Sequence, residues 1–154
     1  STLAKLLVGS LASRSGDVRL DGIDLYKWSR MQIGRNIGSL TQEINLFDGT
    51  IKDNIIRLGD CNDEWLVKAA KMADVYEFIL KLPSGFDSKI GLNGIELSAG
   101  QKQKLALARA LYGSPQLIVL DEPASNLDIH GESSLQKTLA LLKKAKSPDC
   151  KSEK

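Results

Sequence analysis

Cysteine and long apolar segments are both scarce in this sequence. Its 154 residues contain two cysteines, Cys61 and Cys150, too few for a disulfide scaffold and without the paired spacing of a zinc site. Unpaired thiols of this kind are typical of a reducing compartment. The longest aliphatic strings are of the Leu117–Leu120 kind, whereas a membrane-spanning helix needs about 20 apolar residues. The first residues show no basic segment followed by an apolar block and a cleavage site, the pattern of a secretory signal peptide.

An excess of charge of one sign is lacking as well. The sequence has 21 basic and 19 acidic side chains, a formal net charge of +2, and the two signs are interspersed. This pattern excludes a polybasic nucleic-acid arm and an acidic tail. The segment Lys143–Lys154 holds five lysines against Asp149 and Glu153, so it alone carries +3 and the preceding 142 residues carry −1. With 42% hydrophobic residues the chain can bury a core, and its length is typical of one domain.

The first 45 residues predict short helices and strands. Apolar residues recur at helical spacing near the start, and an Asp-Gly pair between two alternating segments is a strong hairpin signal. The expected elements are a helix over Leu3–Leu11, a hairpin over Gly16–Leu25 turning at Asp21-Gly22, a short helix over Ser29–Ile33, and a strand over Asn36–Leu40 with Gln42 just beyond it.

The middle third is predicted to be helical, and one more strand follows near Asp121. The expected elements are a helix over Ile51–Leu58 capped by Thr50 and ended by Gly59, a helix capped by Asn62, a short helix around Val75–Ile79 before Pro83, a loop over Pro83–Gly94, a helix over Gly100–Tyr112, a strand over Gln116–Asp121 buried on both faces, and a helix over Gly131–Lys146. Strands and helices that alternate around a helical insertion predict an α/β sheet with an all-helical arm.

Two adjacent acids end the predicted buried strand. Neighbouring side chains of a strand point to opposite faces, so Asp121 and Glu122 can do different work at the edge where open α/β sheets bind ligands. Asp121 is suited to hold Mg²⁺ directly or through water, and Glu122 to polarise an attacking water. The alternative is that both acids only cap the strand and stay solvated.

A second candidate site precedes the helix over Gly100–Tyr112. Ser98 and the first amides of that helix can bind an anion, because unpaired N–H groups and the helix dipole both favour phosphate. Gly100 lacks a Cβ and allows close backbone approach. The alternative is that Ser98 is an ordinary N-cap. Asp121 follows Ser98 by 23 residues (121 − 98), beyond one helix and one strand.

These motifs together resemble the nucleotide-binding domain of ABC transporters, over nearly all of the chain before the lysine-rich tail. Four segments carry the resemblance in the family's order: Thr41-Gln42 as the Q-loop, Leu97–Gln101 as the signature loop, Ile118–Pro123 as the Walker B strand, and Ser125–Asp128 as the D-loop. Ser1-Thr2 stand where the last residues of the Walker A motif G-x-x-x-x-G-K-S-T belong.

Further segments are similar to the type I secretion ATPases within this family. These segments are Leu82–Asp87, Ile90-Gly91 with Gly94, Ala106–Pro115, Asn126 of the D-loop, and Trp28 before the Q-loop strand. Leu46–Ile51 with Asp53–Ile55 is similar to the exporter half of the family more generally. The resemblance implies the motor domain of an exporter that drives protein secretion across the inner membrane of Gram-negative bacteria, converting ATP and water to ADP and phosphate.

The resemblance also implies a fold and a set of residue roles. The fold is a P-loop NTPase (RecA-like) core with a parallel sheet, made of residues 1–45 and 97–146, and an inserted all-helical subdomain over residues 46–96; residues 147–154 form a divergent polar tail. One domain would supply Glu122 as general base, Gln42 as sensor of metal and γ-phosphate, Ser1 and Asp121 at Mg²⁺, and Thr2 at the α-phosphate. The partner domain would place Ser98, Gly100 and Gln101 over the γ-phosphate, and Asp128 would bridge the two sites.

The resemblance also implies a set of partners. They are a second nucleotide-binding domain in a head-to-tail homodimer, a fused transmembrane domain, a periplasmic adaptor, an outer-membrane channel and a secreted protein, with no nucleic acid. The implied location is the cytoplasmic face of the bacterial inner membrane, as part of an integral membrane protein.

Three departures from the family pattern set limits on this interpretation. The sequence has no G-x-x-x-x-G-K, Ala99 stands at the first of two usual signature glycines, and no apolar strand ending in histidine follows the last predicted helix. We therefore expect a fragment that neither binds ATP tightly nor hydrolyses it, because the main cradle of the β- and γ-phosphates is missing. Ala99 would be strained only if its position needs a positive φ.

Two other functions compete with the exporter hypothesis. The first is a truncated, inactive remnant of an ABC domain, acting at most as an interaction module. The second is a chromosome-maintenance ATPase, which is the weakest because no coiled-coil heptads occur. Among single residues, His130 is interpreted as an exposed helix-end residue, Trp28 and Trp65 as packing residues, and Arg109 with Lys102 and Lys104 as a basic face that is solvated or paired locally.

Overall fold

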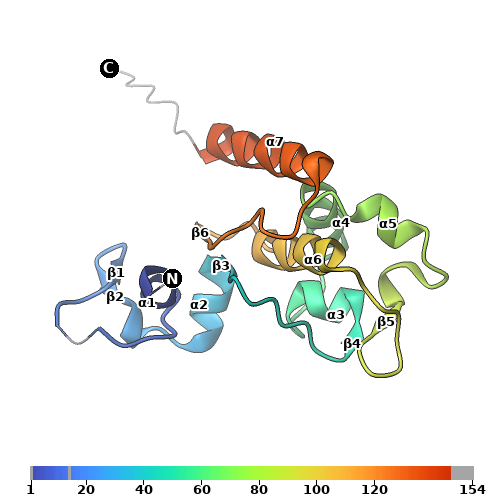
Figure 1. Cartoon of the computed structure of the whole chain (residues 1–154). Coiled ribbons are helices and arrows are strands. Elements are labelled where there is room, and N and C mark those ends of the chain that lie inside the picture. The colour runs from blue at the N-terminus through green and yellow to red at the C-terminus, as the bar shows by residue number, and fades with distance from the viewer. Residues whose placement is uncertain (1, 14, 147–154) are drawn as a thin grey trace, which may run out of the picture.

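The computed structural model describes residues 2–13 and 15–146 and shows an α/β arrangement (Figure 1). The elements are α1 (Thr2–Leu7), β1 (Arg19–Leu20), β2 (Ile23–Asp24), α2 (Arg30–Asn36), β3 (Ile37–Leu40), β4 (Gly49–Thr50), α3 (Ile51–Ile56), α4 (Asp63–Met72), α5 (Tyr76–Leu80), β5 (Lys89–Ile90), α6 (Ala99–Leu111), β6 (Leu117–Leu120) and α7 (Ile129–Lys146). Short 3₁₀ helices cover Leu25–Lys27 and Gly85–Asp87. The predicted tail, residues 147–154, lies outside the described residues.

The predicted hairpin is confirmed as the antiparallel pair β1 and β2. Leu20 pairs with Ile23, and the two residues between them have positive φ, 51° at Asp21 and 79° at Gly22. A two-residue turn with two consecutive positive φ angles has a backbone twist that matches the twist of the two flanking strands. Asp-Gly is a preferred sequence for this turn. The sequence alone therefore explains this element.

A parallel strand pair forms the sheet that the sequence predicts. β3 and β6 pair in parallel over four residues, from Ile37 with Leu117 to Leu40 with Leu120. Helix α6 packs on β3. The expectation that β6 is buried on both faces is wrong, because all four of its residues are only half-buried. Within the described residues β6 pairs with β3 alone, so its other edge has no strand beside it.

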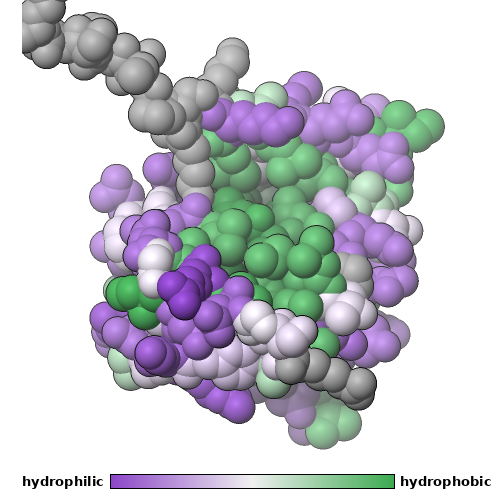
Figure 2. All heavy atoms as spheres, turned by 90° about the vertical axis from the view of Figure 1, so that its left-hand side faces the viewer, coloured by the Kyte–Doolittle hydropathy of each residue, from purple (hydrophilic) through white to green (hydrophobic). Residues whose placement is uncertain are grey.

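Apolar side chains also remain exposed on the side of α1 and the hairpin. Leu3 is 65% exposed, Met31 68% and Ile23 52%. Figure 2 views the molecule from this side and shows an apolar area at the centre of the face, bordered by hydrophilic atoms.

The helical arm of α3, α4 and α5 contains two short strands that the sequence analysis missed. β4 and β5 pair antiparallel, Gly49 with Ile90 and Thr50 with Lys89, so the segment predicted as a loop over Pro83–Gly94 includes a strand. The end of α3 also differs from the prediction. Arg57 and Leu58, both at φ 57°, terminate the helix in the left-handed conformation, and Gly59 has no positive φ.

One hydrophobic cluster joins the arm to the sheet. Its members with at most 1% of their surface exposed include Ile51, Ile55, Val75, Ile79 and Leu105. Helices α3 and α4 of the arm pack on α6, which in turn packs on β3. Because α6 contributes to both sides, the arm and the sheet share one core.

Two half-buried arginines donate hydrogen bonds to backbone carbonyls beside this core. Arg109 donates through Nε to the carbonyl of Asn54 (3.0 Å), through Nη2 to the Asn54 side chain (3.1 Å) and through Nη1 to the carbonyl of Asn45 (3.0 Å). Arg57 donates to the carbonyls of Gly34 and Arg109. Burial lowers the pKa of both guanidinium groups, and the charge of Arg57 lowers the pKa of Arg109 further. Arg109 therefore pairs locally and is not part of a solvated basic face.

The cap of α3 predicts a pH-dependent stability. The hydroxyl of Thr50 (2.6 Å) and its backbone N–H (3.1 Å) both donate to the Asp53 carboxylate, and these hydrogen bonds lower the pKa of Asp53 below its ordinary 3.8. A lowered folded-state pKa stabilises the fold above the unfolded pKa and loses that effect as pH falls through the folded value. We expect Asp53→Asn to flatten the decline of the urea midpoint between about pH 4 and pH 2. Equal slopes in the variant and the parent would contradict this.

Helix α7 packs across the helical arm. Leu135 and Thr138 of α7 are buried, and the Thr138 hydroxyl donates to the carbonyl of Met72 at the end of α4. Figure 1 shows α7 lying over α4 and α6.

Among residues 2–13 and 15–146, no helix combines the length and apolar character needed to cross a membrane.

Candidate active site

The two parallel strands bring the Q-loop and Walker B residues to one edge of the sheet. β3 ends at Leu40 and β6 ends at Leu120, and these two residues are partners in the register. The N–H of Asp121 then donates to the carbonyl of Leu40 (2.9 Å), which extends the ladder by one residue. Gln42 and Glu122 therefore leave the sheet side by side.

A direct hydrogen bond joins these two predicted residues. The side-chain amide of Gln42 donates through Nε2 to Oε2 of Glu122 at 3.1 Å, across 80 residues of sequence. Both side chains are exposed, so they are accessible to a ligand. Glu122 has a φ of 52°, a left-handed conformation that a non-glycine residue adopts only where its surroundings hold it.

The oxygen atoms at this edge of the sheet are suitable ligands for Mg²⁺. Asp121, half-buried, lies at the end of β6, and the Oε1 atom of Gln42 is not used in its bond to Glu122. Carboxylate and amide oxygens are hard ligands, and Mg²⁺ is usually held by one or two carboxylates together with substrate phosphates. Among the residues described, no group of three or more His, Cys, Asp or Glu side chains could hold a metal by itself. The oxygens of Asp121 and Gln42 are of the kind that Mg²⁺ prefers.

The remaining residues predicted around that nucleotide lie at the start of the chain. Thr2 is the exposed first residue of α1, and α1 contacts β6. Ser1, predicted as a metal and nucleotide ligand, lies outside the described residues. The structure thus places Thr2 on an element next to the strand that carries Asp121.

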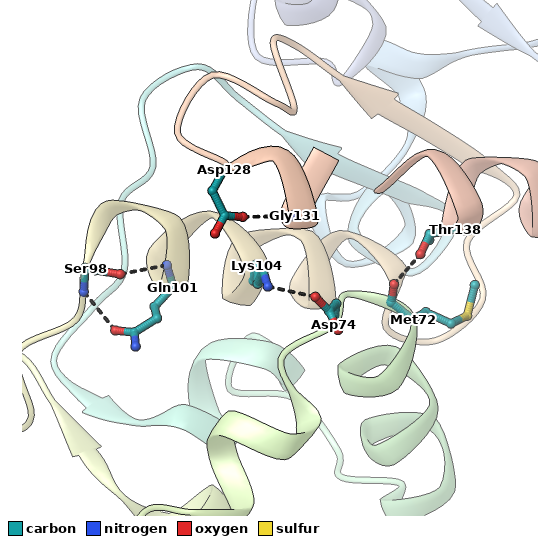
Figure 3. Close-up of polar contacts among 8 residues, drawn as sticks. All are labelled: Met72, Asp74, Ser98, Gln101, Lys104, Asp128, Gly131 and Thr138. Carbon is teal, nitrogen blue, oxygen red and sulfur yellow. Dashed lines mark hydrogen bonds and ion pairs between the residues drawn. The ribbon is translucent and has the colours of Figure 1, made fainter. Parts of the chain in front are cut away.

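The signature loop forms a complete capping box at the start of α6. Ser98 Oγ accepts the backbone N–H of Gln101 (3.2 Å), and Oε1 of Gln101 accepts the backbone N–H of Ser98 (2.9 Å), as Figure 3 shows. The N-cap interpretation of Ser98 is therefore confirmed, and phosphate binding by the same turn stays a prediction. A Cβ added to Gly100 would lie 3.1 Å from the carbonyl oxygen of Asn126, so the close approach expected at Gly100 is made by the D-loop.

Ala99 is the first residue of α6 and has no positive φ. The departure from the usual signature glycine is therefore mild, because a Cβ is compatible with helical dihedral angles. We expect Ala99→Gly to lower the free energy of unfolding by up to about 1 kcal/mol, since glycine is the poorer helix former. Chemical denaturation of the two chains measures this. A gain in stability would indicate that Ala99 is strained after all.

The D-loop and the basic residues of α6 also have local partners. Asp128 Oδ1 accepts the N–H of Gly131 (2.8 Å), so Asp128 caps α7, and its predicted bridging of two sites stays a prediction (Figure 3). Lys104 forms an ion pair with Asp74 at 2.7 Å. His130 is exposed at the start of α7, as predicted. Trp65 contacts the edge of Tyr112 but remains 45% exposed, so it is a packing residue only in part.

One residue of this site was missed by the sequence analysis. Gln103 is 2% exposed, and its side chain bonds to the backbone of the segment that links β6 to α7. Its spacing from the buried residues Leu107 and Ala110 places it on the apolar face of α6. A polar residue on such a face needs a hydrogen-bonding partner, and this signal could have identified it.

The structure does not join the two halves of the predicted ATP site within one chain. In the described part of the chain, no hydrogen bond connects Ser98 or Gln101 to Gln42 or Glu122. An open cleft of about 350 Å³ lies between β3 and the arm, where Arg57 and Arg109 line it, and it contains neither Asp121 nor Glu122.

Comparison with known proteins decides the family. A family model described as ABC transporter matches residues 1–125. The chain belongs to the ABC transporter family. The ABC domain is 49% identical over 140 residues to the type I secretion system ATP-binding protein PrsD of Rhizobium meliloti, covering 90% of this chain and 24% of that protein. It is 39% identical over 146 residues to a putative multidrug export ATP-binding/permease protein of Staphylococcus aureus, covering 94% of this chain and 25% of that protein.

A solved structure supports the fold of the ABC domain. A bacterial Atm1-family ABC exporter with ATP bound superimposes with a TM-score of 0.79 at 32% sequence identity, covering 92% of this chain and 25% of that chain. The fold is therefore that of a P-loop NTPase, as predicted. The chain spans about a quarter of the length of these relatives.

Proposed function

We propose that this ABC domain is part of the ATP-binding and ATP-hydrolysing motor of an exporter for type I protein secretion. The observation that carries the proposal is the pairing of Gln42 with Glu122 (3.1 Å) beside Asp121 at the carboxyl edge of a parallel sheet. The 49% identity with a type I secretion protein supports the choice of exporter class. The reaction is ATP + H₂O to ADP + phosphate.

The edge residues divide the work of phosphoryl transfer. Asp121 and Oε1 of Gln42 would hold the Mg²⁺ that accompanies ATP, together with the Ser1 hydroxyl, and Thr2 would contact the α-phosphate. When bound, Mg²⁺ would supply positive charge beside the phosphate oxygens. Glu122 accepts a proton from the attacking water, and Gln42, already within hydrogen-bond distance of Glu122, orients that water. Most of the rate enhancement then comes from positioning and charge stabilisation.

A second copy supplies the rest of the site. Ser98, Gly100 and Gln101 of one domain cover the γ-phosphate held by its partner in a head-to-tail homodimer, and Asp128 connects the two sites. The lack of a hydrogen bond between the signature loop and Glu122 within the described part of one chain is compatible with this arrangement. In binding, the cap bond between Ser98 and Gln101 exchanges for contacts with phosphate oxygens.

The proposal includes the wider assembly. Residues 1–45 and 97–146 form the ATP-binding core and residues 46–96 the helical subdomain, which contacts a fused transmembrane domain. The complete protein lies at the cytoplasmic face of the bacterial inner membrane and works with a periplasmic adaptor and an outer-membrane channel on a secreted protein.

The 154-residue chain by itself is expected to bind ATP weakly. Its sequence contains no G-x-x-x-x-G-K, whose lysine and backbone amides cradle the β- and γ-phosphates in P-loop proteins. Isothermal titration of the purified chain with MgATP should show no saturable binding in the micromolar range, and phosphate release should equal that of a Glu122→Gln chain. Measurable ATPase activity that Glu122→Gln abolishes would contradict this expectation.

The coding sequence upstream of Ser1 tests the proposed function. An open frame that encodes a G-x-x-x-x-G-K directly before Ser1 and a membrane-spanning helical domain further upstream is the expected result. A stop codon or unrelated sequence there would instead favour an inactive remnant of an ABC domain.

A further inference from the structure

Gln103 is a buried polar residue in the second turn of α6. Its amide has donors and an acceptor that burial separates from water, so each needs a protein partner. Nε2 donates to the carbonyl oxygens of Glu122 (3.3 Å) and Pro123, and Oε1 accepts the backbone N–H of Asn126 (3.1 Å). All partners of this side chain therefore lie within one loop, Glu122–Asn126.

That loop begins with an unfavourable backbone conformation. Glu122 has a φ of 52°, and the left-handed region is unfavourable for a non-glycine residue. Such conformations persist where surrounding interactions hold them. The loop itself contributes one hydrogen bond at Glu122, from the N–H of Ser125 to the Glu122 carbonyl (3.2 Å). Gln103 adds a second donor to the same carbonyl.

The backbone conformation of Glu122 determines the direction of its side chain. With its present φ, the carboxylate lies 3.1 Å from Nε2 of Gln42. A change to an ordinary negative φ would rotate the Cα–Cβ bond relative to the strand. Helix α6 meets the same loop at Gly100, where an added Cβ would lie 3.1 Å from the Asn126 carbonyl oxygen. The helix and the loop thus fit together at two points one turn apart.

We propose that Gln103 is a positioning residue: its buried amide holds the loop Glu122–Asn126 in the conformation that turns the Glu122 carboxylate toward Gln42. The catalytic meaning of this geometry rests on the proposed function of Glu122. Because Gln103 lies in α6 and Ser98 is the N-cap of that helix, the Gln103 side chain links the helix of the signature turn to the loop Glu122–Asn126 of the same chain.

The test uses the 154-residue chain without nucleotide, labelled for NMR. Gln103→Met keeps the size of the side chain and removes all three hydrogen bonds. We expect exchange of the Asn126 amide proton to become roughly tenfold faster relative to amides in the middle of α6, because it loses its acceptor. We also expect loss of the nuclear Overhauser effect between the Gln42 side-chain amide and the Glu122 methylene protons.

The matched control is Leu105→Ala on the same helix, since Leu105 is 1% exposed and has its contacts in the core cluster. It lowers global stability but should leave both loop signals as in the parent. Unchanged loop signals in Gln103→Met, or equal changes in Leu105→Ala, would overturn the proposal.

A measurement on the parent chain covers the case in which Gln103→Met does not fold. The Gln103 side-chain amide protons should show Overhauser effects to the α-protons of Glu122 and Pro123 and slow exchange with solvent, and their absence would overturn the proposal as well. Since no readout needs ATP, a failure of the proposed ATPase function would leave these results unchanged and is therefore distinguishable.

Discussion

Replacing Gly38 by alanine is expected to lower the free energy of unfolding by at least about 3 kcal/mol, at the upper end of overpacking effects, or to prevent folding. A Cβ at this position would lie 1.8 Å from the carbonyl oxygen of Ala110 and 3.0 Å from Cγ of Pro115. The first obstacle is backbone of α6 and cannot rotate away. Relief of the clash requires α6 to move off β3, and α6 also supports the arm.

Urea denaturation followed by circular dichroism measures this effect. Gly34→Ala is the matched control, because its added Cβ has its nearest neighbour, Nη1 of Arg57, at 3.8 Å and the residue lies within α2. Alanine is the better helix former, so the control should gain roughly 0.5–1 kcal/mol. A Gly38→Ala chain within 1 kcal/mol of the parent would show that the contact between β3 and α6 is looser than described.

Glu122→Gln is expected to lower kcat for ATP hydrolysis by about 10²–10⁴, the usual contribution of a general base. The measurement uses a chimera in which the aligned segment of this chain replaces the 140 matched residues of the Rhizobium meliloti relative. Glutamine keeps the shape of the side chain and can still contact Gln42, but its amide cannot accept the proton of the attacking water. The KM for MgATP should therefore change little.

Glu132→Gln is the matched control for this chimera. Glu132 is an exposed acid of α7, and the same substitution there should leave kcat within about twofold of the unsubstituted chimera, as for a side chain outside the site. If Glu122→Gln also stayed within that range, Glu122 would not be the base. A chimera that is inactive with the native Glu122 would favour the remnant hypothesis.

Interactions that reach only three residues along the chain were predictable from sequence. Thr50 and Ser98 begin their helices with complete capping boxes, and the Asp21-Gly22 turn has the φ angles expected of that dipeptide. Helix caps and tight turns are formed by hydrogen bonds and backbone angles of residues that are close in sequence, so a short stretch of sequence is enough to predict them. The end of α3 was not predictable in this way, because Arg57 takes the left-handed conformation while its side chain donates to the distant carbonyls of Gly34 and Arg109.

The candidate site also combines features that were predictable from the sequence with features that were not. The order of motifs predicted that Gln42, Asp121 and Glu122 belong together, yet their hydrogen-bonded geometry depends on the register between β3 and β6 across 80 residues. Gln103 was missed because a glutamine between two lysines resembles a solvated position until its burial is known.

Some features of this protein were determined by the sequence, and others were decided only by the tertiary structure. The sequence by itself determined the ABC family, the helix caps and the hairpin, because motif order and short-range hydrogen bonds are encoded in neighbouring residues. The tertiary structure alone decided that β6 is half-buried, that Arg109 donates hydrogen bonds to backbone carbonyls, and that Gln103 connects α6 to the loop Glu122–Asn126. Each of these depends on which distant segments pack together, and long-range packing has no signature in a local stretch of sequence.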